Sequence, residues 1–234
     1  MVKFYKKGEV ASKYDEERFT GQGGEIINRR EKKNVLDLLG DIEGKKILDL
    51  GAGTCRYSVL FSEQGAEVTA MDISQEMLNE GKKKAEERGV EDKINFIKGD
   101  ALNTGFEDNS FDIVTAMRLF HLVPDPKGLF KEMKRVTNDR VLFDFFNLWS
   151  LRMLYNKSLP MKSKLRRKRK MKNLLVRNGF YNIEIKRDFL IPYGAYRFSP
   201  KPLPLFFSKL DYIGRKIFFS KRVSSVIYLT GKKS

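Results

Sequence analysis

The residues best suited to chemistry stand at Gly51-Ala52-Gly53-Thr54, directly after the apolar run Lys46–Leu50. Glycines at the end of a strand let the backbone turn sharply and approach a ligand closely. The helix expected next would offer N–H groups and positive potential at its start. Because ligands of open α/β sheets bind at the carboxyl ends of the strands, this turn is the first candidate binding site.

Asp72 ends a second predicted strand, Glu67–Asp72, 21 residues after Gly51. A carboxylate in this position can accept hydrogen bonds from both hydroxyls of a ribose, so the pair indicates a nucleoside ligand. Nicotinamide-dinucleotide proteins share this arrangement, but their third fingerprint glycine would fall at Arg56. The dinucleotide interpretation is therefore disfavoured.

His121 and Cys55 are the only histidine and the only cysteine of the chain. One cysteine can form neither an internal disulfide nor a thiolate cage for a metal, and one histidine excludes zinc sites built on histidine pairs. We therefore expect metal-free chemistry in a cytoplasmic protein. No apolar run is long enough to cross a bilayer or to act as a secretion signal.

Apolar strands alternate with helices through the middle of the chain, which predicts a doubly wound α/β sheet that is mostly parallel. One helix is expected to begin after Ser74, as its N-cap, and to end near Arg88. Another is expected around Lys127–Arg135. The five strands predicted in this part are 46–50, 67–72, 94–97, 111–116 and 140–146.

The two ends of the chain have a different pattern. Residues 9–39 have helical spacing, interrupted at Thr20–Gly24, where the glycines predict a hinge or lid. After Asn147 we expect a helix at Met171–Arg177, a strand at Asn182–Lys186, an amphipathic insertion at Pro200–Arg222 and a last strand at Ser225–Leu229. The predicted organisation is a helical lid (1–39), a core (40–147) and a segment that completes the sheet (148–234), all within one domain.

The charge of the chain is concentrated in its last third. The net charge is +16, but residues 150–234 hold 22 lysines and arginines against three acidic residues. Such asymmetry predicts an anionic partner for this part: a membrane surface, a phosphorylated substrate or a nucleic acid.

Together these residues resemble the class I, Rossmann-like methyltransferases that use S-adenosylmethionine (SAM), in particular the type 11 group that includes quinone-biosynthesis C-methyltransferases. The resemblance covers roughly residues 40–147 and also rests on Gly99-Asp100-Ala101, Asp108–Asp112 and His121–Pro126. It implies a seven-stranded sheet with an antiparallel last strand. It also implies SAM as the cofactor, S-adenosylhomocysteine (SAH) as the product, and no metal.

The resemblance implies a role for residues at the ends of the first four strands. The glycine turn would face the methionine part of SAM, Asp72 its ribose, and the residues after the third strand its adenine. Core packing is the alternative for two apolar members, Ile73 and Met77. The implied set is Asp49, which supports the turn, with Gly51, Ala52, Gly53, Asp72, Ile73, Met77, Asp100, Ala101 and Met117.

Two positions depart from the pattern of the family. Cys55 stands where a third glycine is usual, and Thr137-Asn138-Asp139-Arg140 replaces a glycine-rich turn. Cysteine is small and Asn-Asp also forms turns, so a turn is still expected at both places.

Methyl transfer needs alignment of the acceptor and exclusion of water, because SAM already carries the leaving group. A general base is needed only where the acceptor loses a proton, and His121 is the candidate, with a structural role as the alternative. By resemblance, Tyr14, Arg18 and Phe19 belong to a lid over the cofactor; a solvated helix is the alternative.

The acceptor has several possible identities. Ala116-Met117-Arg118-Leu119 lacks the motif of exocyclic-amine methylases, so an oxygen or carbon of a small, lipid-like, isoprenoid or phosphorylated acceptor is favoured. An RNA methyltransferase, with Lys164–Lys170 on phosphates, and a non-catalytic SAM-binding protein are the alternatives. In one interpretation the basic third lies on an anionic membrane at the inner face; in another it is only a solvated face. The residues of the membrane interpretation are Leu205, Phe206, Phe207, Lys209, Arg215, Lys216, Phe218, Phe219, Lys221 and Arg222.

Overall fold

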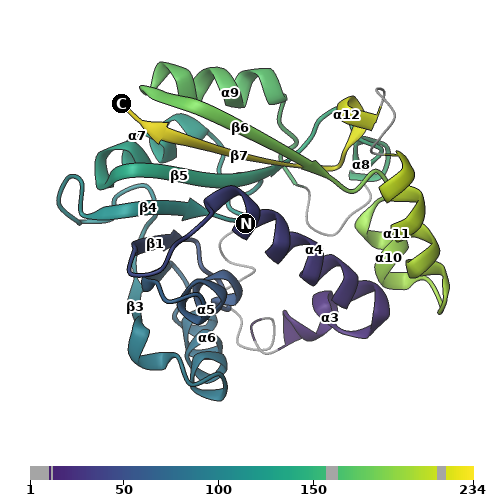
Figure 1. Cartoon of the computed structure of the whole chain (residues 1–234), viewed down its shortest axis with the longest axis horizontal. Coiled ribbons are helices and arrows are strands. Elements are labelled where there is room, and N and C mark those ends of the chain that lie inside the picture. Colours follow the sequence, from purple (N-terminus) through teal and green to yellow (C-terminus); the bar gives the residue numbers. More distant parts are fainter. Residues whose placement is uncertain (1–10, 12, 157–162, 215–219) are drawn as a thin grey trace.

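A mixed β-sheet forms the centre of the molecule (Figure 1). The computed structural model describes residues 11, 13–156, 163–214 and 220–234. Within these residues the sheet has seven strands in the order β3-β2-β1-β4-β5-β7-β6. β1 to β5 are parallel, and β7 is antiparallel to both β5 and β6. The strands are β1 (Lys46–Leu50), β2 (Glu67–Asp72), β3 (Ile94–Lys98), β4 (Phe111–Ala116), β5 (Thr137–Phe146), β6 (Phe180–Asp188) and β7 (Val226–Lys233).

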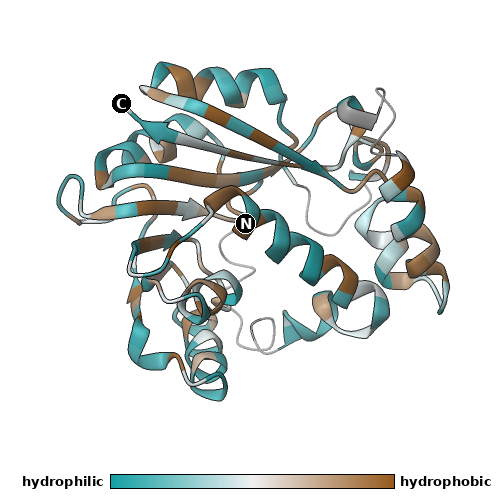
Figure 2. Ribbon diagram, in the orientation of Figure 1, coloured by the Kyte–Doolittle hydropathy of each residue, from teal (hydrophilic) through white to brown (hydrophobic). Residues whose placement is uncertain are grey.

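Helices cover both faces of this sheet, as predicted, and the alternation of side chains along β1 shows why. Ile47 packs into the core on one face, beneath α4, α5 and α6, and Leu48 packs into the core on the other, beneath α7 and α9. In Figure 2 the central strands β4 and β5 are largely brown, whereas α6 and α9 carry many teal residues. These helices are α4 (Gly21–Leu39), α5 (Arg56–Glu63), α6 (Gln75–Glu87), α7 (Pro126–Val136) and α9 (Lys168–Arg177).

Several local predictions are confirmed at the level of single residues. β1, β2 and β4 have the predicted bounds. The Ser74 hydroxyl caps α6 by accepting the Met77 N–H at 3.3 Å. The short helix η1 (Glu91–Lys93) joins α6 to β3.

The turn expected at Thr137–Arg140 was wrong, because these residues are the first part of β5. Phe111 of β4 pairs with Thr137, whereas Ile113 pairs with Arg140, so β5 has one extra residue opposite Asp112. The Thr137 hydroxyl donates to the carbonyls of Asp112 (3.2 Å) and Arg140 (3.1 Å). The residues that were expected to form a turn are therefore part of a β-bulge in β5.

The helix break predicted near the N-terminus falls at Thr20, between α3 (Glu16–Phe19) and α4. Gly21 has a left-handed φ of 66° at this break, so the predicted interruption is confirmed at the start of the run, whereas Gly23 and Gly24 continue as the first turn of α4. Their small size has another use: a Cβ on Gly23 would lie 1.8 Å from the carbonyl oxygen of Tyr196, and one on Gly24 would lie 2.6 Å from the backbone of Phe19. These glycines let α4 pack closely against its neighbours.

The C-terminal part adds α8 (Arg152–Tyr155), α10 (Tyr193–Phe198), α11 (Leu203–Gly214) and α12 (Ser220–Val223) around β6 and β7. A buried polar cluster ties this part to α4. The Arg30 guanidinium forms ion pairs with Asp188 and, at 3.0 Å, with Asp211. The fully buried Asp211 also accepts the Tyr196 hydroxyl at 2.7 Å and the backbone N–H groups of Leu190 and Ile191 at 3.1 and 3.0 Å. Segments about 180 residues apart are thus held by one carboxylate.

We expect Asp211→Ala to lower the free energy of unfolding by about 3–5 kcal/mol, because it leaves a buried cation and three donors short of an acceptor. Urea unfolding measures this change. The matched control is Asp37→Ala, which removes a carboxylate from the more exposed pairs with Lys33 and Lys186 and should cost no more than about 1 kcal/mol. Equal losses of unfolding free energy in the two variants would contradict the view that Asp211 ties the C-terminal part to α4.

Candidate active site

The glycine turn after β1 is held against the end of β2 by its own backbone. The N–H groups of Gly51 and Ala52 both donate to the carbonyl oxygen of Met71, at 2.8 and 3.0 Å. The next N–H, of Gly53, donates to the Asp72 carboxylate at 2.8 Å. These three N–H groups already have acceptors within the chain, so they are not free to bind a ligand. The turn instead has its shape fixed before a ligand binds.

Gly51 is required at its position for two reasons. Its φ of 66° lies in the left-handed region, which favours glycine. A Cβ there would also lie 2.9 Å from the Leu119 side chain, which comes from the loop after β4. The glycine therefore lets the two loops approach and form opposite sides of one cavity.

Cys55 takes the left-handed conformation, with φ of 55°, for which a glycine would be the usual residue. Its side chain is fully buried and lies where a Cβ on Gly81 of α6 would be 2.3 Å from the sulfur. The space that Cys55 needs is provided by the glycine on the facing helix. Burial raises the pKa of the thiol, so it stays protonated and acts as a packing group.

Asp49 lies beneath the turn. Its carboxylate is buried and accepts the hydroxyls of Ser58 (2.7 Å) and Thr115 (2.8 Å), so it joins β1 to α5 and β4. Burial raises the pKa of Asp49 to about 6. The residue is outside the cavity lining, in a position suited to the supporting role that was predicted for it.

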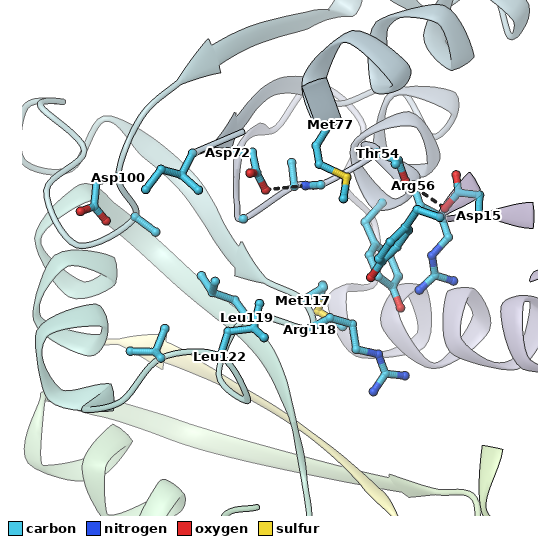
Figure 3. A pocket seen from close by; sticks show the side chains of 18 of the residues that line it. Asp15, Thr54, Arg56, Asp72, Met77, Asp100, Met117, Arg118, Leu119 and Leu122 are labelled. Atoms are coloured by element: carbon cyan, nitrogen blue, oxygen red, sulfur yellow. Dashed lines mark hydrogen bonds between the residues drawn. The ribbon is translucent and has the colours of Figure 1, made fainter. Parts of the chain in front are cut away.

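A cavity of about 300 Å³ opens at the carboxyl ends of β1, β2 and β4 (Figure 3). Figure 3 shows Asp72 and Asp100 toward one end and Arg118 toward the other. Burial raises the pKa of Asp72, opposed by the N–H groups of Ser74 and Gly53. The structure brings together in the lining nine residues of the predicted cofactor set, Gly51, Ala52, Gly53, Asp72, Ile73, Met77, Asp100, Ala101 and Met117.

The N-terminal helices complete the cavity. Tyr14 and Phe19, two of the predicted lid residues, line it, whereas Arg18 lies outside the lining and stacks on the Tyr14 ring at 3.8 Å. Asp15 also lines the cavity and was missed by sequence reasoning. It accepts the Thr54 hydroxyl at 2.9 Å and forms an ion pair with Lys84, so it ties this segment to the glycine turn and to α6. Whether the segment moves as a lid stays a prediction.

Arg118 and Arg56 are polar members of the lining that sequence reasoning also missed. Arg118 has a φ of 57°, and its backbone N–H donates to Asp144 at 2.5 Å. Its guanidinium forms ion pairs with Asp144, at 2.9 Å, and with Glu31 of α4. Arg56 pairs with the same Glu31 at 2.6 Å. Two cavity arginines are thus held by carboxylates from distant parts of the chain. No local sequence pattern predicts such ion pairs.

His121 is placed apart from the cavity lining, although its neighbours Leu122 and Val123 belong to it. The imidazole is buried and packs edge-on against Phe146, with 5.1 Å between ring centroids. Burial, with repulsion by Arg118, Arg152 and Arg18, lowers its pKa well below the usual value. Such surroundings disfavour the imidazolium that a general base must form, so the position favours the structural alternative. The base role stays a prediction.

The residues that line the site suit a sulfonium nucleoside. Asp72 is a buried carboxylate at the end of β2, where it can accept ribose hydroxyls, and apolar side chains such as Ile73 and Met77 can cover an adenine. In the described part of the chain, no three His, Cys, Asp or Glu side chains come together as a metal site.

Comparisons with known proteins agree with this architecture. A family model described as a methyltransferase domain matches residues 48–143. The chain is 38% identical over 129 residues to a demethylmenaquinone methyltransferase of Renibacterium salmoninarum, covering 55% of this chain and 51% of that protein. It is 34% identical over 129 residues to a ubiquinone/menaquinone biosynthesis C-methyltransferase of Roseobacter denitrificans, covering 54% and 51%. The chain thus spans about half the length of these relatives.

Solved structures show the same fold. Magnesium protoporphyrin IX methyltransferase from Synechocystis, with bound SAH, matches with a TM-score of 0.69 at 16% identity, covering 100% of this chain and 98% of that one. Geranyl diphosphate C-methyltransferase from Streptomyces coelicolor matches with a TM-score of 0.67 at 14% identity, covering 90% and 80%. The sheet order and these matches define the class I, Rossmann-like methyltransferase fold. Residues 48–143 match the model of the methyltransferase domain family.

We expect Asp72→Asn to weaken SAH binding by about tenfold to a hundredfold, because a charge-assisted hydrogen bond to the ribose is lost and the Gly53 N–H loses its charged acceptor. Calorimetric titration measures the affinity. Asp92→Asn, the same change on an exposed residue of η1, should leave it unaltered. An Asp72 variant that folds normally and binds SAH as tightly as the parent would contradict the ribose assignment.

We expect His121→Gln to keep SAH affinity and to change turnover by less than about tenfold, because the ring lies in a buried, cationic setting apart from the cavity. The low pKa also predicts no loss of activity from His121 protonation as the pH falls from 8 to 6. Turnover measured across this range checks both statements. A loss of a hundredfold or more would restore His121 as the base.

Proposed function

We propose that this protein is a SAM-dependent methyltransferase that transfers a methyl group to an oxygen or carbon of a small, lipid-like acceptor. One observation carries the proposal: the carboxylate suited to a ribose and the apolar walls suited to an acceptor belong to a single cavity beside the glycine turn. The names of the relatives, which act in quinone biosynthesis, support an acceptor of this kind.

The chain would contribute by binding and orientation. When bound, SAM supplies a methyl group on a positively charged sulfur, which is already a good leaving group. Asp72 would hold the ribose, Ile73 and Met77 would pack against the adenine, and the turn would set the position of the sulfur. Phe19 and Leu119 face the same cavity and would exclude water from the line between donor and acceptor.

The acceptor side of the cavity is mainly apolar. Leu119, Leu122 and Val123 come from the loop after β4, and Phe19 comes from the N-terminal helices. These side chains favour a lipid-like or aromatic acceptor over a hydrated polymer. Arg166, in the basic segment once considered for RNA, donates to the carbonyl of Val123, so this arginine supports the cavity loop. These contacts favour a small, lipid-like acceptor over RNA. A non-catalytic SAM-binding protein is the other alternative to this proposal.

We expect labelled methyl from SAM to appear in the organic phase when the purified protein is incubated with a lipid extract. The reason is the apolar acceptor side of the cavity, and the measurement is the partition of label between phases. Asp72→Asn is the inactive control and should lower incorporation by at least tenfold. Label found only in RNA or in water-soluble products would contradict the lipid-like acceptor.

A peripheral position on an anionic membrane fits the C-terminal part. Exposed apolar side chains occur on α11, where Phe206 is 53% and Ile213 is 59% exposed, and beside α8, where Trp149 is 60% exposed. α8 and α11 lie toward the same end of the molecule (Figure 1), in the part that carries the excess of lysines and arginines. Arg215, Lys216, Phe218 and Phe219 lie outside the described residues. Among the described residues, no helix is long and apolar enough to span a bilayer.

We expect the protein to sediment with anionic vesicles, but not with neutral ones, and to dissociate at high salt. Phe206→Ser should weaken the anionic binding by about tenfold or more, because a phenyl group no longer enters the interface. Val176→Ser, an equally exposed position on α9, is the matched control and should have little effect. Equal binding to both kinds of vesicle, or to neither, would contradict the proposal.

A further inference from the structure

Three arginines gather around two aromatic rings, and one of them, Arg118, lines the cavity. The Arg118 guanidinium lies 5.0 Å from the ring centroids of both Phe146 and Tyr193. Arg152 lies over the same Phe146 ring at 3.8 Å, and Arg197 lies 5.6 Å from the Tyr193 ring. Three guanidinium groups therefore lie close to two aromatic rings.

Arg18 is the fourth member of this arginine cluster, which we define as Arg18, Arg118, Arg152 and Arg197. It stacks on Tyr14, which lines the cavity, and it is close enough to Arg197 to lower the pKa of that guanidinium. The four residues come from α3, from the loop after β4, from α8 and from α10. Only the folded chain brings them together.

The carboxylates near the cluster are already engaged. Asp144 pairs with Arg118, and Glu31 pairs with both Arg118 and Arg56. Across the residues that the structure describes, neither Arg18 nor Arg197 forms an ion pair with a carboxylate. The cluster thus has more positive than negative charge.

Arg197 is the member of the cluster in which the effect of this excess positive charge is clearest. Its Nε is buried and has no hydrogen-bond partner among the described residues. Burial and the nearby Arg18 lower the pKa of Arg197 to about 10, which is unusual for a guanidinium. A buried donor and a repelled cation are both stabilised by an oxyanion, and guanidinium groups bind phosphate and carboxylate through paired N–H donors.

We propose that the arginine cluster binds an oxyanionic group, phosphate or carboxylate, carried by the methyl acceptor. The proposal deepens the proposed function and rests on it, because it places the acidic group of the acceptor beside Arg118, the member of the cluster that lines the cavity. In Figure 3 Asp100 lies at the end away from Arg118, where its charge would repel an anion, whereas Asp15, which lies near Arg56, is paired with Lys84. The acceptor is then amphiphilic, with an apolar body along Leu119 and an acidic group beside the arginines.

The test uses calorimetric titration of inorganic pyrophosphate and of acetate into the intact protein, with and without saturating SAH. We expect at least one of the two anions to bind at millimolar concentration or below, and to bind equally well when SAH is present. A preference for pyrophosphate indicates a phosphorylated acceptor, and a preference for acetate indicates a carboxylate. Failure of both anions to bind would overturn the proposal.

Single substitutions test where on the protein the anion binds. Arg197→Met should lower the anion affinity by at least tenfold while SAH affinity stays within about threefold, and Arg18→Met provides the same test should Arg197→Met fail to fold. The control is Arg177→Met in the exposed basic groove formed by α9 with Lys127 and Arg167, and it should bind the anion like the parent. The proposal is overturned where the Arg177 variant alone loses binding or where both cluster variants retain it.

Two further outcomes distinguish this proposal from the alternatives. Competition between the anion and SAH would mean that the cluster holds the carboxylate of the cofactor's methionine part, which overturns an acceptor role. Absence of SAH binding in the parent protein would instead remove the proposed function, and the anion titration without SAH would still decide whether the cluster is an anion site.

Discussion

The site depends on the way the end of β2 holds the turn that follows β1. Three successive N–H groups of the turn find acceptors there, two on the Met71 carbonyl and one on the Asp72 carboxylate. Asp72 therefore has two tasks: it shapes the turn and it faces the cavity where a ribose would lie. Because the same carboxylate does both, the geometry of the turn and the position of the nucleoside are linked.

A second buried network sets the other end of the cavity. Glu31 of α4 and Asp144 of β5 hold Arg118 from two sides, and Glu31 also holds Arg56 at the start of α5. The helix α4 is thereby attached to the loop after β4, and through Arg118 to β5, beside the cavity. Buried ion pairs of this kind add little net stability, but removal of one partner is costly, so they favour one arrangement of the surrounding chains.

Much of the core could be predicted from the sequence because its signals are local. The glycine turn, the N-cap at Ser74 and the alternation of strands and helices each depend on neighbours within a few residues. The same holds for Asp72, whose place at the end of a strand is visible in the sequence. Such residues are found by pattern because the backbone conformation they need is set by their own type and spacing.

The rest could not be predicted, because its signals are long-range. Arg118 acquires its role from Glu31 and Asp144, and Arg197 is affected by Arg18 of α3, some 180 residues earlier. The glycines at the start of α4 were expected to bend the chain, yet Gly23 serves the close approach of Tyr196. Cys55 replaced an expected glycine, and its accommodation depends on Gly81 of another helix. In each case the decisive partner is far away in the sequence.

The most direct test of the account is calorimetry of the purified protein with SAM and with SAH. A pre-shaped turn and a buried carboxylate at the end of β2 predict saturable binding of both ligands with a Kd well below millimolar, and weaker binding of adenosine, which lacks the methionine part. If neither SAM nor SAH produces a binding signal at millimolar concentration, the central claim that this turn holds a sulfonium nucleoside is contradicted.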